Sequence, residues 1–121
     1  MYGYSLGSTF AARIGAMHQP KYIILEAPFY SFKRAVKHNF TLAPTFLMRY
    51  SFKSYEDVPK ITSPMTIFHG TNDQTTSYAE SKDLFNLVGA ENKQFITLEE
   101  GTHHNLATFE KYQQVLKKLL E

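Results

Sequence analysis

Three short, mostly apolar runs are the clearest feature of the hydrophobic pattern along this chain. They lie at residues 22–25, 65–69 and 94–98, and polar residues, a proline or a glycine bound each of them. The run at residues 22–25 is apolar at successive positions, which is typical of a strand buried on both faces, as the strands of a parallel sheet are. The pattern therefore predicts three short strands, the first of them buried on both faces.

Helical segments fill much of the chain between and after these runs. Helices are predicted over residues 6–17, 78–88 and 106–120, where apolar or small residues gather on one face. Pro20 follows the first helix and Gly89 the second, and both residue types are typical of helix ends. Helices and strands that alternate in this order predict an α/β fold: three main parallel strands with flanking helices, in one domain over residues 1–121.

Composition excludes several classes of protein. The chain has 121 residues, with 13 basic and 11 acidic side chains and no cysteine. A net charge of +2 without a basic cluster gives no footprint for nucleic acid, and the lack of cysteine excludes disulfides and thiolate metal sites. No stretch approaches the roughly 20 apolar residues of a membrane span, and the chain shows no signal segment. We expect a domain without metal or other cofactor, in a reducing, cytoplasmic compartment.

Four polar side chains lie where the predicted strands end. Ser5, within the pentapeptide GYSLG, opens the first helix; Asp73 follows the strand at 65–69; and His103 and His104 follow the strand at 94–98. The carboxyl ends of parallel strands share one edge of a sheet, so we expect these side chains to meet there. A serine hydroxyl becomes an effective nucleophile when an imidazole takes its proton and a carboxylate orients the imidazole. Serine, acid, histidine is also the chain order expected for this layout.

The residues that flank Ser5 fit a sharp turn from a strand into a helix. Gly3 and Gly7 are predicted to stand where neighbours approach too closely for a β-carbon, and Ser5 to adopt a strained backbone conformation. The backbone N–H of Leu6, at the start of the helix, would then point at a developing oxyanion.

Each of these residues also has a simpler interpretation. The pentapeptide is short, and Asp73 in the string GTND suits a turn or a helix cap. Two histidines in a polar loop are commonly solvated, or they form a metal site. The joint occurrence of these residues, in this order and on loops of this kind, favours a catalytic site.

Four stretches, YGYSLGS, LEAPFYSF, PMTIFHGTND and EEGTHHNL, resemble the corresponding segments of serine hydrolases with the α/β-hydrolase fold. They look most similar to the bacterial esterase-like branch related to protein depalmitoylases and monoacylglycerol lipases. The resemblance implies hydrolysis of small acyl esters or acyl thioesters through an acyl-enzyme intermediate. It implies Ser5 as the nucleophile, Asp73 as the acid, His104 as the general base and Leu6 as the oxyanion donor.

The family pattern also decides between the two histidines. It has a glycine, two residues, a histidine and often an asparagine, which Gly101 to Asn105 match with His104 in the histidine position. His103 is the second choice, because relatives usually carry a small residue there. His69 matches a strand-end position and is interpreted as a supporting residue.

The segment over residues 29–56 is rich in aromatic residues, and Pro44 divides it into two short predicted helices. This short helical segment matches the place where the family inserts a cap over its acyl pocket. The resemblance implies that Phe40, Phe46, Leu47 and Met48 contact an acyl chain. Packing of the same side chains against the sheet explains their apolar character equally well.

The resemblance further implies about as much chain again before Gly3, with additional strands and a second oxyanion donor. We therefore expect the C-terminal half of a hydrolase domain, its N-terminal half missing. It would be weakly active or inactive alone, because one lost oxyanion donor costs about two to three orders of magnitude in rate. An uncovered sheet edge would favour self-association or pairing with another chain. The alternative to an enzyme is a non-catalytic fragment or interaction module derived from such a hydrolase.

Overall fold

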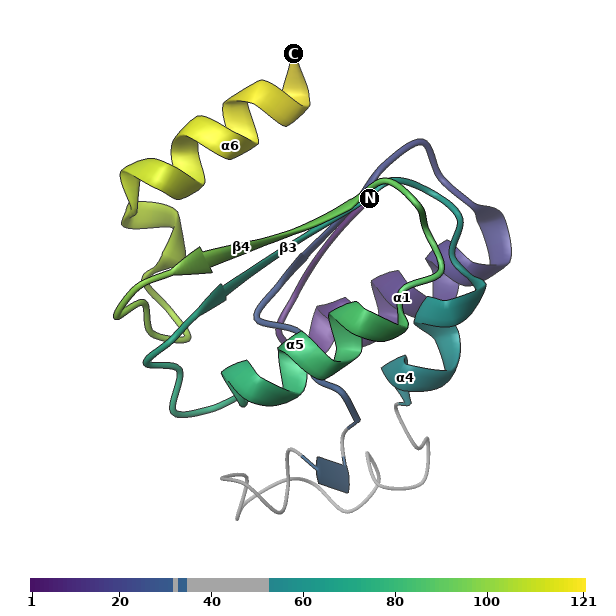
Figure 1. Cartoon of the computed structure of the whole chain (residues 1–121), viewed down its shortest axis with the longest axis horizontal. Coiled ribbons are helices and arrows are strands. Elements are labelled where there is room, and N and C mark those ends of the chain that lie inside the picture. The colour runs from purple at the N-terminus through teal and green to yellow at the C-terminus, as the bar shows by residue number, and fades with distance from the viewer. Residues whose placement is uncertain (32, 35–52) are drawn as a thin grey trace.

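A parallel sheet with helices on both faces forms the described part of the chain, which a computed structural model gives for residues 1–31, 33–34 and 53–121 (Figure 1). The sheet has four strands that lie side by side in chain order. They are β1 (Tyr2–Tyr4), β2 (Ile23–Glu26), β3 (Met65–Gly70) and β4 (Lys93–Leu98). The predicted α/β class and the parallel arrangement are confirmed.

The strand in front of Ser5 is short, and the hydrophobic pattern did not predict it. β1 pairs with β2, and Tyr2 lies opposite Ile24 and Tyr4 opposite Glu26. The three predicted strands correspond to β2, β3 and β4, so the sheet has one strand more than expected. A segment of three residues is too short to show a period, which is why the pattern missed β1.

The helices cover the two faces of the sheet unequally. Figure 1 shows α1 (Leu6–His18), α4 (Ser54–Asp57) and α5 (Tyr78–Leu87) on one face and α6 (Glu110–Leu120) on the other. Two 3-10 turns, η1 (Val58–Lys60) and η2 (Leu106–Thr108), precede β3 and α6. The helix predicted over 106–120 is thus interrupted at Phe109, whose backbone is extended with φ −77° and ψ 132°.

Each face of the sheet carries its own apolar cluster. Every residue of β2 and β3 is buried, which confirms the predicted burial of the run at residues 22–25 on both faces, whereas most of β4 is only partly buried. The cluster towards α1 and α5 includes Ile23, Leu25, Ile61, Met65, Ile67 and Leu84. The cluster towards α6 includes Ile24, Phe68, Leu98, Leu106 and Tyr112. The two clusters hold the strands so that their carboxyl ends form one edge, where the candidate site lies.

The predicted cap falls largely on residues that the structure does not describe. Phe40, Phe46, Leu47 and Met48 all lie outside the described residues. In the described part of this segment, the rings of Tyr30 and Tyr55 stack with their centroids 5.1 Å apart. In the part of the chain that the structure covers, no helix combines the length and the apolar character needed to cross a membrane.

Candidate active site

Ser5 lies at the turn between β1 and α1, and its backbone conformation is unusual. Its φ is 54° and its ψ −120°, a region that residues other than glycine rarely occupy. Two backbone hydrogen bonds hold the turn: the Ser5 N–H donates to the Glu26 carbonyl at 2.9 Å, and the Ser8 N–H donates to the Ser5 carbonyl at 3.0 Å. The predicted strained turn at Ser5 is confirmed.

The two glycines that flank Ser5 have different roles. A β-carbon on Gly3 would lie 2.7 Å from the Ala11 β-carbon, so α1 can approach β1 only because this position is glycine. The same prediction for Gly7 is wrong, because a β-carbon there meets no described atom within 4 Å. Leu6 is the first residue of α1, so its N–H belongs to the helix-start groups that have no acceptor within the helix.

His103 connects Ser5 to Asp73. The Ser5 Oγ lies 2.8 Å from Nε2 of His103, and Nδ1 of His103 lies 2.9 Å from Oδ2 of Asp73. The side chains of His103 and Asp73 are only 6% and 0% exposed. A carboxylate can only accept, so Nδ1 of His103 carries the hydrogen, and in the neutral imidazole Nε2 then accepts from the Ser5 hydroxyl.

The expected placement of His104 between Ser5 and Asp73 is wrong. His104 is exposed, and its Nδ1 lies 3.0 Å from the Tyr4 hydroxyl instead. The rings of His103 and His104 contact each other nearly perpendicularly, at 86°, and it is the His103 ring that reaches both Ser5 and Asp73. Both nitrogens of His103 are occupied by Ser5 and Asp73, and the described residues contain no group of three or more His, Asp or Glu side chains suited to a metal ion.

A close contact between two glycines determines the position of the loop after β4, residues 99–105, which is called the histidine loop below. A β-carbon on Gly70 would lie 2.1 Å from the Gly101 carbonyl oxygen, so only glycine allows the loop to reach the end of β3. The same carbonyl accepts from the Asn72 N–H at 2.9 Å. Beyond this contact, the Thr102 N–H donates to Oδ1 of Asn105 at 2.8 Å. The loop thereby turns inward one residue earlier than the family pattern implied.

Asp73 receives hydrogen bonds on both carboxylate oxygens. Its Oδ1 accepts from the N–H groups of Thr75 and Thr76, each at 2.8 Å. Its Oδ2 accepts from the Thr76 hydroxyl at 2.8 Å and from His103. Burial raises the pKa of Asp73, but the hydrogen bonds from His103, His69 and Thr76 outweigh it and hold this pKa well below its usual range. Asp73 therefore orders its own turn, as the simpler interpretation suggested, and stays ionised while it faces His103.

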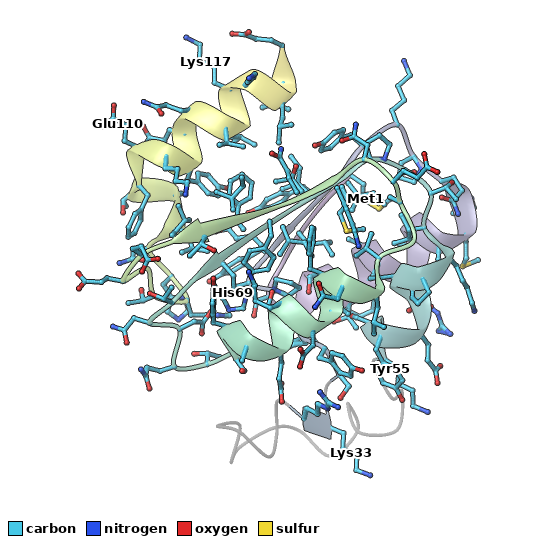
Figure 2. All side chains as sticks on the ribbon, in the orientation of Figure 1. Met1, Lys33, Tyr55, His69, Glu110 and Lys117 are labelled. Atoms are coloured by element: carbon cyan, nitrogen blue, oxygen red, sulfur yellow. The ribbon has the colours of Figure 1, made fainter. Side chains whose placement is uncertain are left out.

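Two further residues contact the Asp73 carboxylate. His69, fully buried below the sheet in Figure 2, has its Nε2 3.2 Å from Oδ2 of Asp73, which fits the supporting position expected of it. Thr76 was missed by the sequence reasoning, although the spacing Asp-x-x-Thr is a recognisable signal for a side chain that closes a local turn. Together, these contacts fix the orientation of the carboxylate.

The fold is part of an α/β-hydrolase fold, and the solved structures agree. An esterase domain from Rhodothermus marinus has 18% identity and a TM-score of 0.73, over 98% of this chain and 57% of that one. An esterase from Pyrococcus furiosus has 14% identity and a TM-score of 0.77, over 98% of this chain and 51% of that one. A monoacylglycerol lipase from Paleococcus ferrophilus has 14% identity and a TM-score of 0.68, over 98% of this chain and 65% of that one. The chain thus spans less than two thirds of the length of each of these structures.

The family follows from the sequence match. Residues 43–111 match the family described as serine aminopeptidase, S33, and because this is more than half of the chain, the protein belongs to that family. The matched segment includes Asp73 and His103 and begins after Ser5. No curated protein matches the sequence significantly. The resemblance to α/β hydrolases that the sequence suggested is confirmed.

Proposed function

We propose that this chain carries the catalytic residues of a serine hydrolase that cleaves carboxylic ester or thioester bonds. The observation that carries the proposal is the continuous hydrogen-bond chain from Ser5 Oγ through His103 to Asp73, at 2.8 Å and 2.9 Å. The strained backbone of Ser5 supports it, because such strain is concentrated at functional sites. In this proposal, His103 takes the general-base role that the sequence assigned to His104.

The proposed reaction has two steps. Nε2 of His103 takes the Ser5 proton as Oγ attacks the acyl carbon, and the Leu6 N–H donates to the oxyanion that forms. The intermediate collapses as the leaving alcohol or thiol takes the proton from His103, and Ser5 is left acylated. Water then attacks the acyl group with His103 again as base, which releases the acid and restores Ser5. Asp73 remains ionised and stabilises the imidazolium in both steps.

The substrate class rests on similarity. The solved structures named above are described as esterases and a monoacylglycerol lipase, which favours an acyl ester over other substrates for this chain. The apolar residues Phe40, Phe46, Leu47 and Met48 remain the proposed acyl contacts. We also propose that residues 1–121 are the C-terminal part of one hydrolase domain, because the chain covers only 51–65% of the same three structures. A second oxyanion donor would then belong to the other part, so the chain alone is expected to react slowly.

A second candidate function is a non-catalytic interaction module. It is favoured by the position of β1, whose outer edge has no neighbouring strand in the described sheet. An open edge of this kind offers backbone N–H and C=O groups to another chain. The two functions differ in one measurable property, the reactivity of Ser5.

Labelling with a fluorophosphonate probe tests the proposal directly. We expect the probe to modify Ser5 of the full chain, because the probe needs only the activated hydroxyl and an oxyanion donor. Ser5→Ala and His103→Ala should abolish labelling, whereas His18→Ala, which removes an exposed histidine at the end of α1, should not. Label on another residue, or labelling that persists in His103→Ala, would contradict the assigned roles. A folded chain that takes no label would favour the interaction module.

A further inference from the structure

The hydroxyl of Tyr4 occupies a position that the proposed reaction does not use. Tyr4 is the last residue of β1, directly before Ser5, and its ring lies against His103 with the centroids 5.4 Å apart. The hydroxyl donates to the His103 carbonyl at 2.7 Å and lies 3.0 Å from Nδ1 of His104. The residue before the candidate nucleophile thus contacts both histidines of the loop.

We propose that Tyr4 and His104 form a clamp that positions His103 against Ser5. The proposal rests on the proposed function, in which His103 is the base. It assigns positioning roles to two residues, Tyr4 and His104, neither of which touches the reacting atoms. It also assigns a structural role to His104, which does not reach Asp73.

The hydrogen bonds of the Tyr4 hydroxyl determine which ring nitrogen of His104 carries a hydrogen. The Tyr4 hydroxyl has one hydrogen, and a carbonyl oxygen can only accept, so that hydrogen points to the His103 carbonyl. The hydroxyl oxygen must then accept from His104, which requires a hydrogen on Nδ1 of His104. Neutral histidine in water favours the hydrogen on Nε2. The clamp therefore selects the less common neutral tautomer of His104, and the charged form retains the same Nδ1–H.

The clamp ties together two segments that are distant in the sequence. Tyr4 and His103 are 99 residues apart, and the hydroxyl joins them beside the bond between Ser5 and His103. Other hydrogen bonds of the histidine loop come from the segment after β3, where the Asn72 N–H donates to Gly101 and the Thr71 hydroxyl accepts from Glu100, and from Asn105 within the loop. The clamp is thus a side-chain tie between the histidine loop and β1. A shift of about 1 Å in a catalytic group can cost about a hundredfold in rate, so such a tie affects the reaction directly.

The surroundings of Tyr4 keep its hydroxyl protonated. Burial raises the pKa of Tyr4, and the nearby negative charges of Glu26 and Asp73 raise it further. The hydroxyl therefore remains a donor to the His103 carbonyl throughout the neutral and mildly alkaline range.

The tautomer of His104 can be measured without any catalytic activity. In nitrogen-15 NMR spectra of the imidazoles of the full chain, we expect neutral His104 to carry its hydrogen on Nδ1. Tyr4→Phe removes the hydroxyl and should move the hydrogen to Nε2. A wild-type His104 protonated on Nε2, or a tautomer that Tyr4→Phe leaves unchanged, would overturn the clamp. This readout holds even if Ser5 proves unreactive, so failure of the clamp and failure of the proposed function are distinguishable.

Labelling rates then test whether the clamp positions His103. His104→Ala should slow labelling of Ser5 by about fivefold, as expected for one lost hydrogen bond, and Tyr4→Phe, which removes both hydrogen bonds of the hydroxyl, by about fivefold to tenfold, each with little change in probe affinity. The double variant should be no slower than Tyr4→Phe. His104→Asn should restore most of the rate, because its side-chain N–H can replace the Nδ1–H. Tyr22→Phe, which loses a 2.7 Å bond to Thr66, is the control and should label normally. Additive losses, or no rescue by His104→Asn, would contradict a positioning role.

Discussion

His103 and Asp73 form a buried pair whose charges depend on each other. In the proposed reaction, His103 takes a proton from Ser5, and its imidazolium would lie 2.9 Å from a carboxylate whose side chain is fully buried. An ionised Asp73 offsets the cost of burying that positive charge, and its other donors, such as the Thr76 hydroxyl, keep it ionised. The same hydrogen bonds make Asp73 a contributor to the stability of the fold.

The stability contributed by Asp73 should depend on pH in a definite direction. The pKa of Asp73 is lower in the folded chain than the value of about 3.9 expected when unfolded. Its stabilisation is therefore fully present above about pH 5 and is lost as the pH falls below about 4 towards the folded pKa. We expect Asp73→Asn to lower the free energy of unfolding by about 2 kcal/mol at pH 7, and by clearly less at pH 3.

Urea unfolding at the two pH values measures this effect. Asp83→Asn, which alters an exposed carboxylate on α5, is the matched control and should change stability little at either pH. A difference between wild type and Asp73→Asn that is equal at pH 7 and pH 3 would show that the charge of Asp73 does not stabilise the fold.

The elements show which features the sequence could predict. Apolar runs and helical periodicity predicted β2, β3, β4, α1 and α5 within two residues, because packing of apolar side chains against the core determines those patterns. The positions of Ser5 and Asp73 at strand ends followed from the same reasoning. The choice between His103 and His104 did not, because it depends on the contact between Gly70, the last residue of β3, and Gly101, in the loop after β4. Local spacing carries no information about such a contact, and the same holds for the Tyr4 hydroxyl.

Gly70→Ala tests whether the end of β3 determines the position of the histidine loop. The added β-carbon would lie 2.1 Å from a backbone oxygen, so the loop must move. We expect a loss of about 1–3 kcal/mol in stability and a fall of about a hundredfold in the labelling rate of Ser5. Gly7→Ala is the control, because its β-carbon meets no described atom and alanine favours a helix; stability should rise by about 0.5–1 kcal/mol. Equal behaviour of the two variants would contradict this account of the loop.

At the scale of the molecule, several large apolar side chains are exposed on β1 and on the helix that packs against it. α1 packs against β1 and β2, and its apolar side chains Ile14 and Met17 are 43% and 69% exposed. Met1 and Tyr2, at the start of the chain and on β1, are also exposed, at 44% and 53%. Among the described residues, no strand pairs with the outer edge of β1, and both β1 and α1 expose apolar side chains. These features are suited to an isologous contact, in which β1 of two copies pairs antiparallel and the α1 helices approach each other.

Self-association through this end of the sheet is therefore expected, and Ile14→Lys should reduce it. A lysine at this exposed position leaves the fold intact but places like charges on both sides of a two-fold contact, which opposes association. Sedimentation velocity over a range of concentrations should show dimers of the wild-type chain and monomers of Ile14→Lys. Leu120→Lys, which changes a side chain that is 74% exposed at the end of α6, is the control and should still dimerise. A wild-type chain that remains monomeric, or a dimer that survives Ile14→Lys, would exclude this surface as the contact. Labelling of Ser5 should be equal in both lysine variants, because neither position contacts the Ser5–His103–Asp73 chain.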